Sequence, residues 1–392
     1  MNPPRRGTPD FLLLFLTFVL VCFGLAMVFS ASSMTSAFYD KYNNDPWFFT
    51  KKQLMAVGLG TVGMLFCMNL HYTKLKKLVI PAFFVIVVLL VLVIFTSKSN
   101  GAASWFNVGK FGIQPTEFAK LIVILYLASL ISNKEEKFRN FKKGLLPALV
   151  IVGFVSILIM LQPDLGSCMI LLVCSAIVII VGGSNLKHIF FLGTGLAAIG
   201  TMVVTLYLLK NNTAETSSSY RVNRLTSFLD PWADTSDTGY QVVQSLFAFG
   251  HGGLTGAGFG QGIQKLHYLP EAHNDFIFAI IGEEFGFIGS SLFILIFLLF
   301  IWRGILVAVR SPDLFGMVAG VGIMSIFAFQ AVINIGGVTG SIPLTGVTLP
   351  FISAGGSSMM VSLISMGILL SISREQTHKE DAKPKKRPNR FQ

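Results

Sequence analysis

Residues 11–30 read FLLLFLTFVLVCFGLAMVFS, an apolar run without a charged residue. A helix needs about 20 apolar residues to cross the roughly 30 Å hydrocarbon core of a bilayer. Arg5 and Arg6 precede the run, as basic residues precede a signal peptide. The apolar core of a signal peptide is usually only about 7–15 residues long, and here further apolar runs follow. We therefore interpret residues 11–30 as the first, uncleaved helix of a membrane protein.

Nine more apolar runs follow the first. The fifth and sixth runs of the chain are separated only by QPDLG at 162–166, where a proline and a glycine indicate a tight turn. The nine runs cover residues 53–70, 78–96, 115–132, 145–162, 165–183, 188–209, 276–302, 314–335 and 351–373. The pattern predicts an all-α integral membrane protein of about ten transmembrane helices. Its polytopic membrane domain covers 11–373, between an N-terminal segment 1–10 and a polar tail 374–392.

The composition agrees with lipid as the main solvent. Hydrophobic residues make up 53% of the chain and charged residues only 12%, whereas soluble domains carry about 25% charged residues. The net charge is +11, but the charges lie in short loops and in the tail. They do not form the single basic face that nucleic-acid binding requires, so we expect no nucleic-acid partner.

The distribution of Lys and Arg predicts the orientation. With the N-terminus inside, the inner loops and the tail hold most of the basic residues, as the positive-inside rule requires. Both termini are then cytoplasmic. The basic tail either contacts anionic lipid of the inner leaflet or only fixes the topology as a solvated segment.

One outer loop, residues 210–275, is much longer than the others and precedes the eighth helix. Loops of this length are usually functional. Arg221 and Arg224 stand three apart, and their guanidinium groups suit phosphate oxygens; anchoring beside lipid headgroups is the alternative. The glycine-rich stretch 250–262 lacks the Gly-Lys-Ser/Thr ending of a nucleotide-binding loop. We interpret it as flexible or tightly turned backbone near a headgroup.

The loop ends in LPEAHND at 269–275, which runs directly into an apolar helix. Asp275 at this edge has two compatible interpretations. It can cap the helix through backbone N–H groups, or it can act as a general base whose pKa is raised by desolvation. On the same helix, Gly282 and Gly286 predict close approach of another helix or a groove for a lipid tail. Glu283 and Glu284 are expected to pair or to face a wet cavity, because charge within a membrane is costly.

Other outer segments also carry polar groups. Glu117 and Lys120 stand three apart and can form an ion pair, either purely structural or shaping a cavity. Asp164 lies in the tight turn, where it either forms the turn or contacts substrate. The last outer loop, 334–358, is rich in Gly, Pro, Ser and Thr. We expect it to be re-entrant or to line a cavity, since non-helical backbone near lipid needs protein or water partners; a tight turn is the alternative.

Several motifs together resemble the SEDS family (shape, elongation, division and sporulation) of peptidoglycan glycosyltransferases. The resemblance covers about 11–373 and is closer to the division branch than to the elongation branch. Ser104 and Ser341 depart from the usual pattern. The matching motifs are Trp105 with QPTEFAK at 114–120, QPDLG at 162–166, Arg224 through DPW at 230–232, the glycine-rich stretch, LPEAHNDF at 269–276 and PFISAGGSS at 350–358.

The resemblance implies a polymerase of lipid II at the outer face of the cytoplasmic membrane. Asp275 would deprotonate the 4-hydroxyl of the acceptor, and lipid diphosphate would leave with inversion. A divalent cation, Mg²⁺ or Mn²⁺, can assist the leaving group, though no convincing all-protein metal site is evident. The residues expected to contact substrate are Arg221, Arg224, Lys120, Glu117, Asp164, Trp105, Glu271, His273 and Ser357.

The resemblance also implies partners and a location. These are a single-span class b penicillin-binding protein, other division proteins, membrane lipid and a place at the division septum. Two other functions stay open: a lipid II flippase, and a scaffold without activity. Transporters keep their site near the bilayer midplane, whereas the distinctive residues here lie in outer loops, which favours the enzyme.

Overall fold

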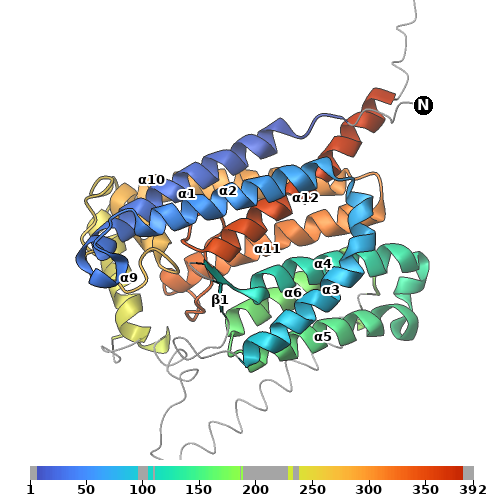
Figure 1. Ribbon diagram of the computed structural model, residues 1–392, viewed down its shortest axis with the longest axis horizontal. Helices are drawn as coiled ribbons and strands as arrows, with labels where there is room; N and C mark the ends of the chain where they lie inside the picture. Colours follow the sequence, from blue (N-terminus) through green and yellow to red (C-terminus); the bar gives the residue numbers. More distant parts are fainter. Residues whose placement is uncertain are drawn as a thin grey trace, which may run out of the picture.

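The computed structural model describes residues 7–95, 105–108, 111–185, 187–188, 228–232 and 238–382. Long helices run side by side in this part of the chain (Figure 1). Helices α3 to α6 form one group, and α11 packs against α4 and α6 of that group. The long helices are α1 (Phe11–Phe38), α2 (Phe48–Asn69), α3 (Tyr72–Ile94), α4 (Pro115–Lys134), α5 (Leu146–Leu161), α6 (Leu165–Val181), α10 (Ile277–Val309), α11 (Leu314–Val338) and α12 (Gly356–Ala382).

These helices correspond to nine of the ten predicted runs; the remaining run, 188–209, falls almost entirely outside the described residues. Seven helical stretches among the described residues are long and apolar enough to cross a membrane, and α6 is a shorter apolar helix. The outward faces of the long helices carry large apolar side chains, such as Phe18, Phe66, Phe84 and Leu298, which are more than half exposed. Lipid is the solvent that such a surface requires. The all-α membrane fold is therefore confirmed.

Shorter elements join the helices. The 3₁₀ turns η1 (Asp40–Tyr42) and η2 (Glu135–Arg139) and the π turn η3 (Phe141–Leu145) lie between long helices. Strands β1 (Phe106–Val108) and β2 (Phe111–Ile113) form a small antiparallel hairpin just before α4. Within the long outer loop lies α9 (Thr238–Gly252), which is too short to span a bilayer.

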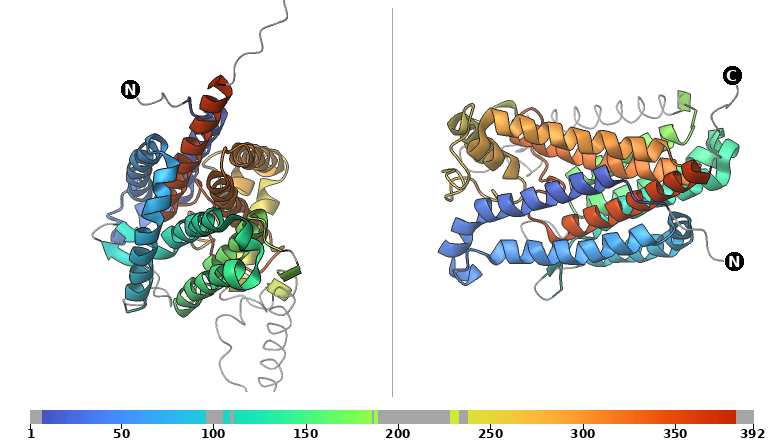
Figure 2. Two further views of the ribbon diagram at one scale, coloured as in Figure 1. Left: turned by 90° about the vertical axis from the view of Figure 1, so that its right-hand side faces the viewer. Right: turned by 90° about the horizontal axis from the view of Figure 1, so that it is seen from above.

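The beginning of α1 and the end of α12 lie together at one end of the bundle. The Arg374 guanidinium of α12 donates through Nε to the Gly7 carbonyl at 3.0 Å, and Figure 2 shows α1 beginning near the end of α12. Asp10 caps α1 and also forms an ion pair with Arg303 of α10, with Nη2 and Oδ2 2.6 Å apart. The two ends therefore lie at the same end of the bundle, as expected if both termini are on one side of the membrane.

Some helix boundaries differ from the prediction. Helix α3 begins at Tyr72, ahead of the predicted residue 78, because the lysines at 74, 76 and 77 extend the helix beyond its apolar part. Helix α12 begins at Gly356, after the predicted residue 351, and continues to Ala382, beyond the predicted start of the tail at 374. Hydropathy marks the lipid-soluble part of a helix and not its ends.

The segment between α11 and α12 folds back into the bundle. The Phe351 ring packs against Phe300 of α10 and Phe327 of α11, with centroids 5.5 and 5.1 Å apart. A Cβ on Gly24, near the middle of α1, would lie 2.1 Å from the Phe351 carbonyl oxygen. Non-helical backbone thus reaches the middle of α1, and the re-entrant interpretation of the last outer loop is confirmed.

Candidate functional site

Asp275 lies where the long outer loop meets the re-entrant segment and α11. The Asn334 amide of α11 donates to the Asp275 carbonyl and to the Val347 carbonyl, both at 2.7 Å. The Ser353 hydroxyl donates to the Asn274 carbonyl at 2.7 Å, and the Ala354 amide donates to the His273 carbonyl at 2.9 Å. Three consecutive carbonyls are held, so the backbone that carries Asp275 is fixed from two other segments.

The predicted helix cap at Asp275 is wrong by one residue. Helix α10 begins at Ile277, and the N-cap position is occupied by Phe276, whose side chain makes no capping bond. The tertiary bonds to the carbonyls of 273–275 hold these residues outside the helix. Asp275 itself is half-buried at the outer end of α10.

The predicted ion pair at the start of α4 is present. Lys120 Nζ lies 2.8 Å from Glu117 Oε1, and both side chains are buried. Gln330 of α11 approaches the other oxygen of Glu117, with Nε2 and Oε2 3.5 Å apart. The Lys120 ammonium therefore lies inside the bundle, below the outer loops, and its charge is compensated by the Glu117 carboxylate.

Asp164 and Ser357 meet at Gln114, the residue before α4. Asp164 caps α6 by accepting from the Ser167 amide at 2.9 Å, as the turn-forming interpretation expected. Its other oxygen accepts from Gln114 Nε2 at 3.3 Å. The Ser357 hydroxyl accepts from the Gln114 amide at 2.9 Å and donates to the Gly112 carbonyl at 3.1 Å. Motifs far apart in the chain thus converge beside the Glu117–Lys120 pair.

The other predicted contact residues have different surroundings. The His273 side chain is buried against Phe49, with ring centroids 4.2 Å apart, so it braces the loop and does not face solvent. Its burial lowers the pKa of the imidazole, and the nearby Glu271 carboxylate opposes this with a smaller effect. Glu271 is exposed and accepts from the Asn274 amide. Trp105 is 40% exposed beside β1, whereas Arg221 and Arg224 lie outside the described residues.

Helix α10 is interrupted at Gly286, where φ is 64° and ψ is −165°. In an unbroken helix, the amides of 287 and 288 would donate to the carbonyls of 283 and 284. The glycine-rich stretch takes all four groups. The bonds, 2.9 to 3.1 Å long, run from Phe287 to Gly253, from Ile288 to Leu254, from Ala257 to Glu283 and from Gly258 to Glu284. The stretch is therefore an ordered part of α10's packing, tightly turned as predicted.

Small residues permit this approach. A Cβ on Gly286 would lie 2.3 Å from the Gly256 amide nitrogen, and one on Gly282 would lie 2.3 Å from the Phe249 ring. A Cβ on Gly252 of α9 would lie 2.1 Å from the Gly282 carbonyl oxygen. The predicted close approach of another helix at Gly282 is confirmed, and that helix is α9.

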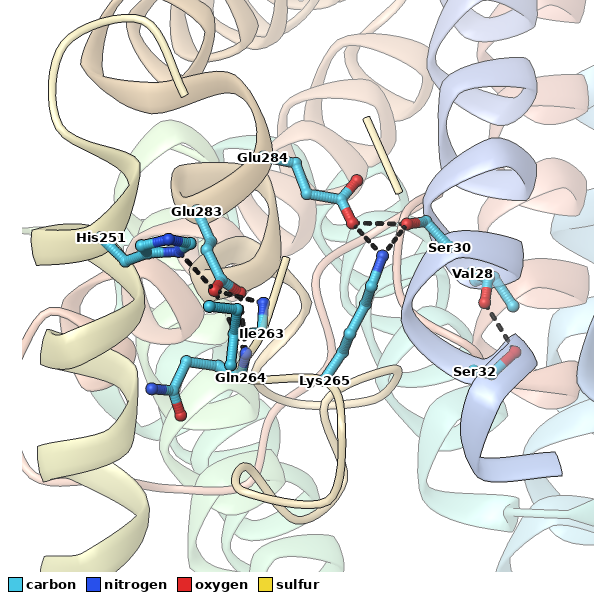
Figure 3. A network of polar contacts seen from close by, with 9 residues as sticks. All are labelled: Val28, Ser30, Ser32, His251, Ile263, Gln264, Lys265, Glu283 and Glu284. Atoms are coloured by element: carbon cyan, nitrogen blue, oxygen red, sulfur yellow. Dashed lines mark hydrogen bonds and ion pairs between the residues drawn. The ribbon is translucent and has the colours of Figure 1, made fainter. Parts of the chain in front are cut away.

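Glu283 anchors the end of the glycine-rich stretch (Figure 3). Its side chain is fully buried. Oε1 accepts from the Ile263 amide at 2.7 Å and from the Gln264 amide at 3.1 Å, and His251 Nδ1 lies 3.0 Å away. The carboxylate therefore fixes two consecutive backbone amides of the loop.

Glu284 points toward α1 and pairs with Lys265 (Figure 3). Lys265 Nζ lies 2.5 Å from Glu284 Oε1, and the two residues are 4% and 1% exposed. The Ser30 hydroxyl of α1 donates to the same oxygen at 2.5 Å and accepts from Lys265 at 2.9 Å. The expectation that the two glutamates find partners is confirmed.

Several polar residues of the site are not evident from the sequence motifs. Asn334 and Lys265 are two of them, and Gln53 of α2 is a third: it donates to the Ser353 carbonyl and accepts from the Gly355 amide, both at 3.1 Å. Asn334 and Gln53 are polar residues within apolar helices, a signal that marks functional or structural sites in membranes. In the described ranges, no group of three or more His, Cys, Asp or Glu side chains could hold a metal ion.

Comparisons with known proteins agree with this architecture. The chain is 44% identical to Stage V sporulation protein E of Bacillus subtilis, over 94% of this chain and 98% of that protein. It is 40% identical to the "Probable peptidoglycan glycosyltransferase FtsW" of Trichlorobacter lovleyi, over 95% of each chain. These relatives span nearly the whole chain, so the similarity is not confined to one motif.

Solved structures give the same result. A chain described under "Structural coordination of polymerization and crosslinking by a peptidoglycan synthase complex" superposes with a TM-score of 0.75 at 30% identity, over 94% of this chain and 98% of that one. The rod shape determining protein RodA of Thermus thermophilus gives 0.65 at 27% identity, over 94% and 97%. The family described as "Cell cycle protein", which groups FtsW, RodA and SpoVE, matches residues 11–378. The chain therefore belongs to the FtsW/RodA/SpoVE family of multi-pass membrane proteins, in agreement with the SEDS motifs of its sequence.

Proposed function

We propose that this chain is a peptidoglycan glycosyltransferase that polymerises lipid II at the outer face of the cytoplasmic membrane, with Asp275 as general base. Relatives that match nearly the whole chain carry the name peptidoglycan glycosyltransferase. The observation that supports the base most directly is the fixed backbone at 273–275, because a general base must be held within reach of the proton it takes.

The reaction is a single displacement. Asp275 takes the proton from the 4-hydroxyl of the acceptor sugar, and that oxygen forms a bond to the anomeric carbon of the donor. The bond from this carbon to the lipid diphosphate breaks, and the diphosphate leaves with the electron pair. Attack from the side opposite the leaving group inverts the anomeric configuration, which converts an α-linked donor into a β-linked glycan.

The negative charge on the leaving diphosphate needs stabilisation. Arg221 and Arg224 are our candidates from the long outer loop, and Lys120 is the candidate from the bundle. Lys120 already pairs with Glu117, so it would contribute orientation and local dipole more than net charge. If Mg²⁺ or Mn²⁺ takes part, we propose that it arrives bound to the diphosphate, since Mg²⁺ is commonly held by one or two carboxylates together with substrate phosphates.

We propose a class b penicillin-binding protein as partner and the septum as the site of action, together with other division proteins. The partner is suggested by the structural relative that is described as part of a peptidoglycan synthase complex. The location is suggested by relatives named FtsW and Stage V sporulation protein E. A fluorescent fusion that gathers at septa would support the location, and an even distribution along the cell envelope would contradict it.

The direct test is synthesis of glycan from lipid II by the purified protein together with its cognate transpeptidase. Glycan strands are the expected product. The same preparation in vesicles without acceptor tests the flippase alternative. Transfer of lipid II between leaflets, with no glycan formed in the first assay, would overturn the proposed function.

A further inference from the structure

Lys265 and Glu284 form a buried ion pair that the proposed chemistry does not use. The pair joins the loop that carries Asp275 to α10, and only 4% and 1% of the two residues are exposed. Buried ion pairs are a weak source of stability, because the loss of hydration offsets most of the attraction between the charges. Its stability contribution alone does not account for the placement of this pair.

The pair fixes one end of the segment that carries Asp275. Lys265 is bonded to Glu284 of α10, and the two residues before it are bonded through their amides to Glu283. The other end of the segment, at 273–275, is bonded to α11 and to the re-entrant segment. Between the two anchors, His267 and Glu271 have φ values of 70° and 55°. Positive φ is uncommon for residues other than glycine, so the segment follows a constrained path between its two anchors, to which the packing of His267 against Phe38 and Tyr39 also contributes.

Next to the pair, the loop meets α1 through polar bonds. A cavity of about 340 Å³ separates α1 from the loop next to the pair. Ser30 and Lys265 both line it, and the rest of the lining comes from Phe29, Ser33 and Met34 of α1 and from residues 259–263 and 266 of the loop. Beside this space, the trio of Ser30, Lys265 and Glu284 joins the loop to α1 through polar bonds, and farther along the loop the His267 ring packs against Phe38 of α1, with centroids 5.1 Å apart.

We propose that the Lys265–Glu284 pair, braced by Ser30, is a positioning element for Asp275. The pair sets the start of the Asp275 segment relative to α1 and α10, and it acts on turnover without contacting substrate. This inference rests on the proposed function. A misplacement of about 1 Å in a catalytic group can lower a rate by about 100-fold, so even a small shift of this anchor has a measurable effect.

The test uses the full-length protein with its transpeptidase and compares three variants: Lys265→Met, Glu284→Gln, and the double variant with both changes. Each single change leaves one charge buried and unpaired, so both single variants are expected to unfold at lower temperature. The double variant leaves no charge and is expected to regain most of the wild-type melting temperature. Its kcat should nevertheless stay about 10-fold or more below wild type with KM within about twofold, since only positioning is lost.

A matched control exists on the same two helices. Asp10 and Arg303 also join α1 to α10 by an ion pair, at the opposite end of the bundle. The double variant Asp10→Asn/Arg303→Gln is expected to keep kcat within about twofold of wild type, because it removes the same kind of bond far from Asp275. Asparagine keeps the cap of α1.

Amide hydrogen exchange of residues 266–276 gives a readout that does not depend on activity. Faster exchange in the Lys265→Met/Glu284→Gln variant, and not in the control, is the expected result. Wild-type kcat and unchanged exchange in that variant would show that the pair is only structural and would overturn the proposal. Should the double variant fail to fold, Ser30→Ala removes only the bracing hydroxyl. It is expected to lower kcat about threefold at constant KM, and no change in either kcat or exchange would overturn the proposal.

The two proposals fail differently in this assay. Wild type and Asp275→Asn are included in each series. If wild type makes no glycan, the proposed function fails, while the exchange data still decide whether the pair positions the segment. If wild type makes glycan and the uncharged pair behaves like wild type, only the positioning role is lost.

Discussion

The side-chain amide of Asn334 donates to the backbone carbonyl of Asp275 at 2.7 Å, across 59 residues of sequence. The same amide nitrogen donates to Val347 in the re-entrant segment at 2.7 Å. One buried residue of α11 therefore connects the two outer segments that carry the family's most distinctive motifs. Its position is what makes the Asp275 backbone a fixed feature of the site.

Replacement of Asn334 by leucine is expected to reduce both polymerisation and stability. The change keeps a similar volume but removes the donor to two backbone carbonyls, and the loss of the buried bond to Val347 costs about 1–3 kcal/mol of unfolding free energy. We expect kcat to fall about 10- to 100-fold as Asp275 moves. Asn44→Ala, on the exposed α1–α2 loop, serves as control. An Asn334→Leu enzyme with wild-type kcat would contradict a positioning role for this bond.

Replacement of Gly24 by alanine tests the re-entrant segment. The added Cβ would lie 2.1 Å from the Phe351 carbonyl oxygen, so the segment or α1 must shift, at a cost of about 1–3 kcal/mol. Gly58→Ala in α2 is the matched control, because a Cβ there meets nothing within 4 Å and alanine favours the helix by about 1 kcal/mol. Thermal unfolding in detergent gives the melting temperatures of both variants. Equal melting temperatures for Gly24→Ala and Gly58→Ala would show that Phe351 does not lie against α1.

The burial of His273 is expected to make the stability of the protein depend on pH. Burial lowers the pKa of its imidazole below the ordinary value of about 6.5. As pH falls below about 6.5, the unfolded chain takes up a proton that the folded chain does not, so the folded state loses stability. Above that pH the contribution is fully present. Melting temperatures measured between about pH 5 and 8 should therefore fall less steeply on the acid side in His273→Phe than in wild type; identical slopes would rule out a buried neutral His273.

The features that could be predicted from the sequence are those decided by residues close together in the chain. Apolar runs placed nine helices because each run must cross lipid, and the Glu117–Lys120 pair could be expected because residues three apart share a helical face. The composition of the last outer loop likewise indicated a re-entrant segment. In each case, the residues that decide the structure are neighbours in the chain.

The rest of the site depends on contacts that spacing does not reveal. The break in α10 at Gly286 was hidden inside a continuous apolar run, because only the docking of the glycine-rich stretch makes the break favourable. Ser30 meets Glu284 across 254 residues, and Asn334 meets Asp275 across 59. Such partners are fixed by the tertiary packing of helices, so a single sequence shows that Glu284 needs a partner but not which one it has.

The central claim is that Asp275 is the base of a lipid II polymerase, and the most direct measurement is the glycan made by Asp275→Asn with its transpeptidase. Asparagine keeps the size of the side chain and removes its ability to accept the proton. Asp45→Asn, which changes a partly exposed aspartate of another outer loop that pairs with Lys51, is the control. We predict wild-type glycan from Asp45→Asn. We predict a well-folded Asp275→Asn protein whose rate is at least about 100-fold lower, in the range that general acid–base catalysis contributes. Glycan at the wild-type rate from Asp275→Asn would contradict the account.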